Sequence, residues 1–322
     1  MLFRSQCMSE GKAAVVVFPG QGSQRPGMGK DFFDAMPVCR QVYEEASDAL
    51  GLDVASLCFE EDPRLNLTEY TQPGIVTTEI AMMRGLAERF GFRADYFGGH
   101  SLGEFTALTA AGVMPFADTV KIVRERGKLM QQAVPVGVGS MAAVISEGVD
   151  VEALRRAFDG LPIDLANINS ANQVVISGRA DALPEAESRV KALFAPPKTC
   201  RFVQLNVSAP FHSRFMQVIE EPFTGVLRDY AGSFNVQNAP RVTSNYSGTY
   251  HEASLDVVIG NLVSQLSHSV RWRDNMQALA SRALQVYEVG PGRPLREFFK
   301  TIGVTCESVT GLSAAEKTFA KT

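Results

Sequence analysis

The residues best suited to chemistry form the stretch Gly99-His100-Ser101-Leu102-Gly103, which fits the Gly-x-Ser-x-Gly pattern of a nucleophile elbow. In such an elbow the serine lies on a cramped strand-to-helix turn, where glycine fits because a Cβ would meet the neighbouring backbone. The N–H groups of the following helix lie close to any negative charge that develops at the serine. Residues 94–98 suit a short buried strand and residues 104–112 suit a helix that ends at glycine, so the context supports the motif. The alternative is a tight glycine turn that only packs a helix against a sheet.

A serine hydroxyl needs an adjacent base to act as a nucleophile, and the chain has four histidines. His100 follows a predicted strand, so its side chain should point away from that of Ser101. His251 follows a turn-like stretch and is expected at the surface, whereas His268, between two serines at a predicted helix end, is ambiguous. His212 lies in a proline-marked loop that is expected at the edge of a cleft. Elimination therefore favours His212 as the base.

No acidic residue stands out as the third member of a catalytic triad. Asp118 and Asp164 lie between the serine and His212 in the sequence, as the triad order of this fold type requires, but neither follows a predicted strand end. A backbone carbonyl or an amide side chain could orient the histidine instead.

Two further features lie on predicted elements elsewhere in the chain. The apolar run 13–18 predicts a buried, parallel strand, and the glycine-rich loop 20–24 after it presents Gln21 where α/β proteins place ligands. That loop lacks the Lys-Ser/Thr ending of a phosphate-binding loop. Arg126 precedes Gly127 on a long helix predicted over residues 116–134. A glycine inside a helix costs about 1 kcal/mol relative to alanine, so it suggests close packing or the close approach of a ligand.

The order of predicted strands and helices divides the chain into two units. Residues 140–207 alternate as strand, helix, strand, strand, helix, strand, which is the ferredoxin-like order. On either side of this segment strands alternate with helices, which indicates a mostly parallel sheet covered on both faces. We therefore predict an α/β fold in which an α/β-hydrolase-like large domain, residues 11–136 and 209–322, carries an inserted small ferredoxin-like (βαββαβ) domain of residues 137–208. In the large domain we expect helices over 30–50, 71–90, 255–266, 272–283 and 293–302, and strands over 241–245 and 285–289.

Composition excludes several classes of protein. The 322 residues are 45% hydrophobic and 20% charged, as in an ordinary globular enzyme. The net charge of -4 gives no basic footprint for nucleic acid, and no apolar run approaches the length that spans a membrane. Residues 1–8 lack the apolar segment of a signal peptide. The five scattered cysteines have no C-x-x-C spacing, which predicts reduced thiols in a cytoplasmic protein without structural zinc.

From about residue 13 to residue 313 the chain resembles the malonyl-CoA:acyl-carrier-protein transacylase family and the related acyltransferase domains of polyketide synthases. Any one of its motifs is a weak signal, whereas all of them in order are specific. The motifs are Phe18-Pro19-Gly20-Gln21-Gly22-Ser23-Gln24, Gly99-His100-Ser101-Leu102-Gly103-Glu104, Arg126-Gly127-Lys128-Leu129-Met130 and Phe211-His212-Ser213, supported by residues 172–178, Gln265 ahead of Val270-Arg271-Trp272, and residues 288–292.

The resemblance implies roles for the catalytic residues. Ser101 would be acylated and His212 would be its base, as a Ser-His dyad whose histidine Gln265 helps to orient. Gln21, together with the backbone N–H of Leu102, would form the oxyanion hole. The loss of one such donor typically costs roughly 3 kcal/mol of transition-state stabilisation.

The resemblance also implies how the acyl group is chosen. Arg126 would bind the free carboxylate of a malonyl group, because a guanidinium holds a carboxylate through two parallel N–H bonds that lysine cannot reproduce. An uncharged acyl group would leave the buried arginine unpaired. Phe211 matches the family's phenylalanine that is associated with malonyl rather than methylmalonyl selection. The family commonly has Gly-Ala-Phe-His where this chain has Ala209-Pro210-Phe211-His212.

The implied reaction is a ping-pong acyl transfer. Malonyl-CoA acylates Ser101, coenzyme A leaves, and the phosphopantetheine thiol of an acyl carrier protein takes the malonyl group. We expect no permanently bound cofactor, no metal, no nucleic acid or membrane partner, and a monomer. Fatty acid and polyketide synthesis both stay open. An acyl hydrolase that clears acyl groups from carrier proteins is the alternative, although an enzyme for uncharged chains has no use for Arg126. A non-catalytic scaffold is a third possibility, which the joint presence of the site residues disfavours.

Overall fold

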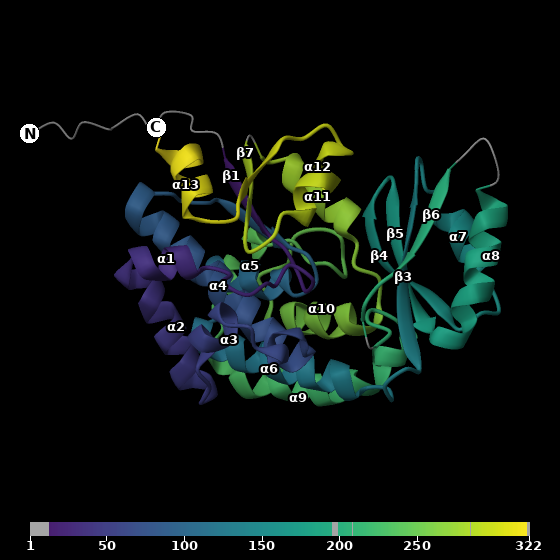
Figure 1. Ribbon diagram of the computed structural model, residues 1–322, viewed down its shortest axis with the longest axis horizontal. Helices are drawn as coiled ribbons and strands as arrows, with labels where there is room; N and C mark the ends of the chain where they lie inside the picture. Colours follow the sequence, from purple (N-terminus) through teal and green to yellow (C-terminus); the bar gives the residue numbers. More distant parts are fainter. Residues whose placement is uncertain (1–12, 195–198, 208, 284, 321–322) are drawn as a thin grey trace, which may run out of the picture.

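In the computed structural model, two sheets organise the chain (Figure 1). The structure describes residues 13–194, 199–207, 209–283 and 285–320. Cys7, the predicted start of the large domain at residues 11–12, its end at 321–322 and the boundary residue 208 lie outside the described residues.

The first sheet is parallel, in the order β2 (Tyr96–Gly99), β1 (Ala14–Phe18), β7 (Gln285–Val289), β8 (Cys306–Val309). Both faces of β1 are buried. Its successive side chains point to opposite sides of the sheet, and those from Val15 to Phe18 are all buried. Val16 and Phe18 belong to the largest apolar cluster, whereas Val15 and Val17 pack in a second cluster with Trp272. Helices therefore cover both faces, as predicted. They are α1 (Lys30–Ala35), α2 (Pro37–Leu50), α3 (Val54–Phe59), α4 (Thr68–Phe90), α5 (Gly103–Ala110), α6 (Phe116–Gln132), α9 (Glu220–Tyr230), α10 (Leu255–Ser267), α11 (Trp272–Ala280), α12 (Pro294–Lys300) and α13 (Leu312–Phe319).

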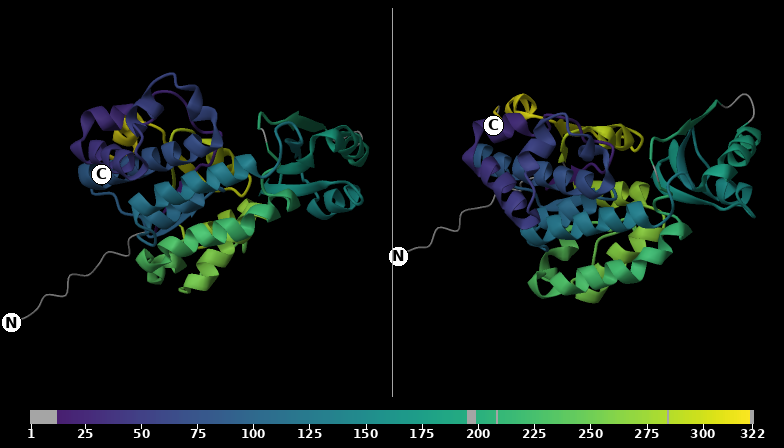
Figure 2. Two further views of the ribbon diagram at one scale, coloured as in Figure 1. Left: turned by 90° about the horizontal axis from the view of Figure 1, so that it is seen from below. Right: turned by 60° about the horizontal axis from the view of Figure 1, so that its bottom comes forward.

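The second sheet is antiparallel, in the order β4 (Ile163–Ser170), β5 (Gln173–Arg179), β3 (Gly139–Ser146), β6 (Cys200–Gln204). Helices α7 (Val151–Ala157) and α8 (Leu183–Leu193) cover one of its faces. The other face joins the largest apolar cluster through Met141 and Val175. This part of the chain projects from the rest in Figure 2. The predicted fold class, an α/β-hydrolase-like part with a parallel sheet and a ferredoxin-like βαββαβ part, is confirmed.

Strand β4 of the second sheet is bonded next to the elbow to two segments outside its own sheet. Val270, just before α11, donates its N–H to Ala166 O at 2.8 Å and accepts from Ile168 N at 2.9 Å. His100 Nε2 contacts Asn169 Oδ1 at 2.8 Å, so the side chain of His100 points toward β4. Strand β4 of the second sheet is therefore fixed against the turn that follows β2.

Several predicted elements needed correction. The single helix expected over 30–50 is two helices, because proline disfavours helical backbone in the residue before it and Met36, before Pro37, is extended. The strand expected over 241–245 makes only isolated bridges, from Val242 to Phe97 and from Thr243 to Tyr250. Elements α3, α9, β8 and α13 were not predicted. Short 3-10 helices cover Pro63–Asn66, Ala180–Ala182, Arg214–Ile219, Ala231–Ser233 and Val236–Arg241.

Candidate active site

The elbow forms where β2 ends and α5 begins, and it requires both of its glycines. A Cβ on Gly99 would lie 1.9 Å from the carbonyl carbon of Gly103, and one on Gly103 would lie 2.2 Å from Phe18 O. Ser101 between them has a φ of 51°. Non-glycine residues rarely adopt such backbone, and they do so chiefly where the surrounding structure enforces it. The packing of α5 against β1 and β2 thus holds the serine in a strained turn.

The structure brings Ser101 and His212 together across 111 residues of sequence. Ser101 Oγ lies 2.7 Å from His212 Nε2, and His212 Nδ1 lies 2.7 Å from the backbone oxygen of Gln265. A carbonyl oxygen only accepts hydrogen bonds, so Nδ1 carries the ring proton and Nε2 is free to accept from the serine hydroxyl. Among the described non-glycine residues, only Ser101 and His212 have a positive φ. The unusual backbone conformation at both residues therefore helps to position the two side chains of this pair.

Burial keeps the His212 imidazole neutral. Burial is the largest cause that lowers the pKa of His212, to about 3, and the positive charge of Arg126 lowers it further. The hydrogen bond to the Gln265 carbonyl opposes both effects. At neutral pH the ring is therefore unprotonated and able to accept a proton.

Arg126 reaches the serine from α6 as a buried cation. It is 1% exposed, and its Nη2 donates to Gln265 Oε1 at 2.8 Å and to Ser101 Oγ at 3.2 Å. Its Nη1 donates to Gln72 Oε1 at 2.9 Å, and its Cζ lies 5.2 Å from the centroid of the Phe105 ring. Its Nε has no hydrogen-bond partner among the described residues. Burial lowers its pKa to about 10, so the guanidinium stays charged at neutral pH. None of these partners is a carboxylate.

The arginine can lie this deep because of the glycine beside it. A Cβ on Gly127 would lie 2.4 Å from Thr68 O at the start of α4. The glycine predicted to mark a close approach on this helix thus marks helix-to-helix packing.

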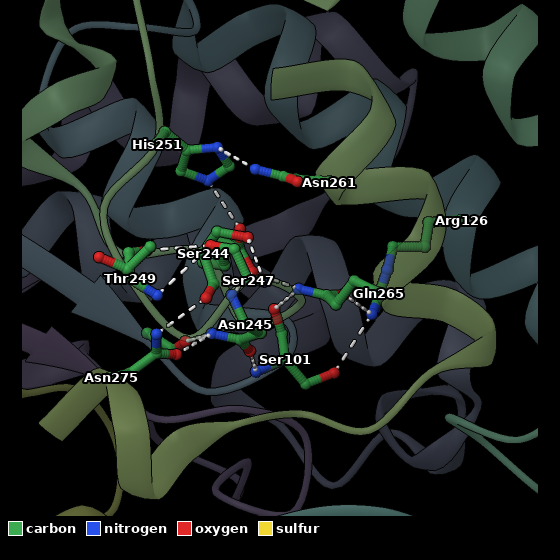
Figure 3. A network of polar contacts seen from close by, with 12 residues as sticks. Ser101, Arg126, Ser244, Asn245, Ser247, Thr249, His251, Asn261, Gln265 and Asn275 are labelled. Carbon is green, nitrogen blue, oxygen red and sulfur yellow. Dashed lines mark hydrogen bonds and ion pairs between the residues drawn. The ribbon is translucent and has the colours of Figure 1, made fainter. Parts of the chain in front are cut away.

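A network of buried polar groups supports the elbow from below (Figure 3). Asn245 Oδ1 accepts from Ser101 N at 2.6 Å, and Asn245 Nδ2 donates to Gly99 O and to Asn275 Oδ1. Glu104, in the first turn of α5, accepts from Asn245 N at 3.0 Å. The network fixes the backbone on both sides of the nucleophile. Sequence reasoning missed Asn245 and Asn275, since no motif marks them, although Glu104 directly follows the elbow.

The remaining predicted site residues differ in whether they contact Ser101 and His212. Gln265 contacts Ser101, Arg126 and His212, as described above, whereas the exposed Gln21 directs its amide to Thr68 Oγ1 at 3.2 Å. The N–H of Leu102, at the start of α5, forms no hydrogen bond with the other described residues. Phe211 is buried directly before His212.

The acidic residues and a histidine that sequence analysis weighed besides His212 have other partners in the structure. Asp118 accepts from Ser233, and Asp164 pairs with Arg214, so neither contacts His212. The expectation that His251 lies at the surface is wrong: it is 2% exposed and its Nε2 lies 2.8 Å from Glu104 Oε1. The turn before it folds back under the elbow, a tertiary placement that local composition does not reveal.

Within the described residues, no group of three or more His, Cys, Asp or Glu side chains is arranged to hold a metal ion. Their helices include none with the length and apolarity that crossing a bilayer demands.

A serine on a nucleophile elbow, paired with a histidine, is a site for acyl transfer through an acyl-serine, and the family model described as the acyl transferase domain matches residues 15–291. The chain is 37% identical over 294 residues to the malonyl CoA-acyl carrier protein transacylase of Bacillus subtilis, with 89% of each chain covered. It is 36% identical over 292 residues to that of Staphylococcus aureus, with 89% of this chain and 91% of the relative covered. The chain belongs to the malonyl CoA-acyl carrier protein transacylase family.

Solved structures agree over almost the whole chain. The malonyl CoA-acyl carrier protein transacylase of Clostridium perfringens superposes with a TM-score of 0.86 at 35% identity, covering 96% of each chain. A malonyl-transacylase solved in complex with its type II PKS acyl-carrier protein superposes with a TM-score of 0.88 at 35% identity, covering 96% of this chain and all of that one.

Proposed function

We propose that this protein transfers a malonyl group from malonyl-CoA to the phosphopantetheine thiol of an acyl carrier protein, through a malonyl ester on Ser101. One observation carries the proposal: the buried Arg126 cation donates to Ser101 Oγ at 3.2 Å and has no carboxylate partner of its own. A buried guanidinium whose direct hydrogen-bond partners are all neutral is costly, so the site favours an acyl group that brings a carboxylate to it. The names of the relatives point to the same donor and acceptor.

The first half-reaction starts at the Ser101–His212 hydrogen bond. Ser101 Oγ gives its proton to His212 Nε2 and attacks the thioester carbonyl carbon, which becomes tetrahedral with a negatively charged oxygen. The N–H of Leu102 and the loop that carries Gln21 stabilise that oxygen. The intermediate collapses with cleavage of the C–S bond, and the proton on His212 passes to the departing sulfur of coenzyme A.

The second half-reaction runs through the same groups. The carrier-protein thiol gives its proton to His212, and its sulfur attacks the malonyl ester on Ser101. The C–O bond breaks and Oγ takes the proton back from His212. Throughout, Arg126 holds the malonyl carboxylate, the Gln265 carbonyl orients the base, and Phe211 narrows the site beside the acyl group against a methyl branch.

The finer features of the protein are part of the same proposal. We propose that residues 137–208 form a small domain inserted in a large domain of residues 11–136 and 209–322. The protein acts as a cytoplasmic monomer without a resident cofactor. These assignments fit a site that hands a charged acyl group from one mobile thiol to another.

Mass spectrometry of the intact protein tests the acyl-enzyme. After mixing with malonyl-CoA, wild type should gain the mass of one malonyl group on Ser101, and Ser101→Ala should gain none. A wild type that never forms the adduct would disprove the proposal.

Adding a phosphopantetheine-bearing carrier protein to the isolated acyl-enzyme separates transfer from hydrolysis. The malonyl group should move to the carrier thiol faster than free malonate appears. Release of malonate at the same rate with and without carrier would favour the hydrolase alternative.

A further inference from the structure

A buried acid–histidine pair lies beneath the elbow, apart from the Ser101–His212 pair. The side chains of Glu104 and His251 are both fully buried, and Glu104 Oε1 lies 2.8 Å from His251 Nε2. Neither residue forms a hydrogen bond with Ser101 Oγ or with His212 among the described contacts. The transfer mechanism gives this pair no task, yet a buried pair of polar groups costs free energy unless its hydrogen bonds are satisfied.

Every hydrogen bond of the pair has a definite direction. Asn261 Nδ2 faces His251 Nδ1 at 3.2 Å and donates to it, so the ring proton is on Nε2 and is donated to Glu104. The other oxygen of Glu104 accepts from Asn245 N at 3.0 Å and from Gln265 Nε2 at 2.7 Å. The carboxylate is thus held by three donors, two from the connection over residues 242–254 and one from α10; Figure 3 labels the donor residues Asn245, His251 and Gln265.

These contacts decide which way the Gln265 amide faces. A carboxylate only accepts, so Gln265 must turn its NH₂ group toward Glu104, and that group also donates to Ser101 O at 3.1 Å. The amide oxygen is then left facing Arg126 Nη2, at 2.8 Å. The reversed amide would place an oxygen against the carboxylate and a donor against the guanidinium, which are both repulsive.

The same arrangement balances the charge of Arg126 without a direct ion pair between its guanidinium and a carboxylate. Glu104 attracts the arginine electrostatically, but Gln265 lies between the two groups. A direct Arg–Glu pair would use the donors that a substrate carboxylate needs. With the amide between them, Nη2 stays at the serine hydroxyl and Nε stays unpartnered.

We infer that His251 and Glu104 are positioning residues for the substrate carboxylate: through the Gln265 amide they hold the Arg126 guanidinium open toward Ser101. This inference rests on the proposed malonyl transfer. The hydrogen bond from His251 fixes the Glu104 carboxylate, and Glu104 fixes which way the Gln265 amide faces. The amide oxygen of Gln265 in turn orients Arg126. Loss of His251 should therefore weaken recognition of the charged acyl group more than it slows the chemistry at Ser101.

Two substitutions at residue 251 form a matched pair for the test. His251→Phe keeps a flat ring but removes the donor to Glu104, whereas His251→Gln keeps an amide N–H near the position of imidazole Nε2. Rapid-quench mass spectrometry measures acylation of Ser101 by malonyl-CoA and by acetyl-CoA across concentrations. We expect His251→Phe to lower the malonyl-to-acetyl ratio of kcat/KM about tenfold, mainly through a higher KM for malonyl-CoA, and His251→Gln to restore it to within about threefold of wild type.

Glu104→Gln is a second probe that keeps the shape of the side chain and removes its charge. It should lower the malonyl-to-acetyl ratio as His251→Phe does, and thermal unfolding of each variant shows whether it is folded. Wild-type ratios in folded Glu104→Gln and His251→Phe would overturn the inference, as would an equal loss with phenylalanine and glutamine at position 251. Failure of wild type to form malonyl-Ser101 would instead refute the proposed function.

Discussion

At the scale of single residues, Arg126 links the choice of substrate to the state of the base. Its guanidinium donates to Ser101 Oγ, and its charge lowers the pKa of His212 in addition to the larger effect of burial. A substrate carboxylate that pairs with Arg126 would offset that charge just when His212 must take a proton. Recognition and proton transfer are therefore coupled electrostatically.

Replacement of Arg126 by glutamine should remove the preference for a charged acyl group. Hydrogen bonds to a charged group contribute about 1.5–3 kcal/mol, so kcat/KM for malonyl-CoA should fall roughly 10- to 100-fold while that for acetyl-CoA holds or rises. Competition between the two thioesters for Ser101 measures this ratio. An unchanged ratio would show that Arg126 does not select the acyl group.

The same variant gives a pH readout with a definite sign. In wild type the pKa of His212, about 3, places the acid limb of kcat/KM well below pH 6.5, the ordinary value for histidine. Without the positive charge the pKa of His212 rises, so the acid limb of Arg126→Gln should move to higher pH. Burial still lowers the pKa, so the limb should stay below pH 6.5.

The residues of the site differ in how far sequence could predict them. Ser101 lies in a local motif, and elimination among four histidines led to His212, whose contact with Ser101 the structure shows. His251 was misplaced because turn composition reports local backbone, whereas its burial depends on a segment 147 residues away in sequence. Asn245 is unmarked for the same reason, since its partners come from β2 and α11.

At the scale of elements, close approach between helices α4 and α6 positions the arginine. A Cβ on Gly127 would lie 2.4 Å from the backbone oxygen of Thr68, so α6 packs directly against the backbone of α4 at this glycine. Sequence located both helices to within a few residues. It marked Gly127 as a position of close packing or close ligand approach, but it did not predict that Thr68 of α4 is what the glycine meets, because helix-to-helix contact is set by packing rather than by periodicity.

Alanine at this contact should destabilise the protein. Gly127→Ala places a methyl group 2.4 Å from Thr68 O, so we expect the free energy of unfolding to fall by about 1–3 kcal/mol, the usual cost of overpacking. Gly225, inside α9, is the matched control, because a Cβ there meets no atom within 4 Å. Gly225→Ala should raise the free energy of unfolding by about 0.5–1 kcal/mol. Denaturant unfolding measures both, and equal effects would contradict the packing argument.

At the scale of the whole molecule, two buried carboxyl groups link stability to pH. Glu79 and Glu288 are both fully buried, and burial is the largest cause that raises the pKa of each; the charge of Glu288 raises the pKa of Glu79 further. Burial raises the pKa of Glu288 to about 7, against two opposing hydrogen bonds from the N–H groups of Leu295 and Arg296. A carboxyl group with a raised pKa in the folded state contributes stability at low pH that is lost as pH rises toward 7.

Glu288→Gln should remove this pH dependence. Relative to wild type, the variant should gain free energy of unfolding between about pH 4.5 and pH 7, by about 3 kcal/mol at most over that interval. The glutamine also loses one acceptor for the α12 N–H groups, which shifts its stability by a constant amount. The slope of the difference against pH, measured by denaturant unfolding, is therefore the test. A difference that is flat over this range would show that Glu288 ionises normally.

The architecture as a whole was largely predictable from sequence. Alternating strands and helices gave the parallel sheet, and the order of elements in residues 140–207 gave the ferredoxin-like part, because both patterns are local. Helix α9 was not predictable in the same way. It carries Pro222 and Gly225 within 11 residues and so lacks a clear helical signal.

The carbonyl that orients His212 belongs to the last turn of α10, which ends at Ser267. Carbonyls in a last helical turn have no partner within the helix, and together they carry its partial negative charge. The imidazolium that forms when His212 takes the serine proton thus faces a helix dipole, which supplies part of what an aspartate supplies in a triad. Every amino acid carries this oxygen, so no side-chain replacement at position 265 deletes it. The orientation of the base is therefore robust to point mutation in a way that a triad's acid is not.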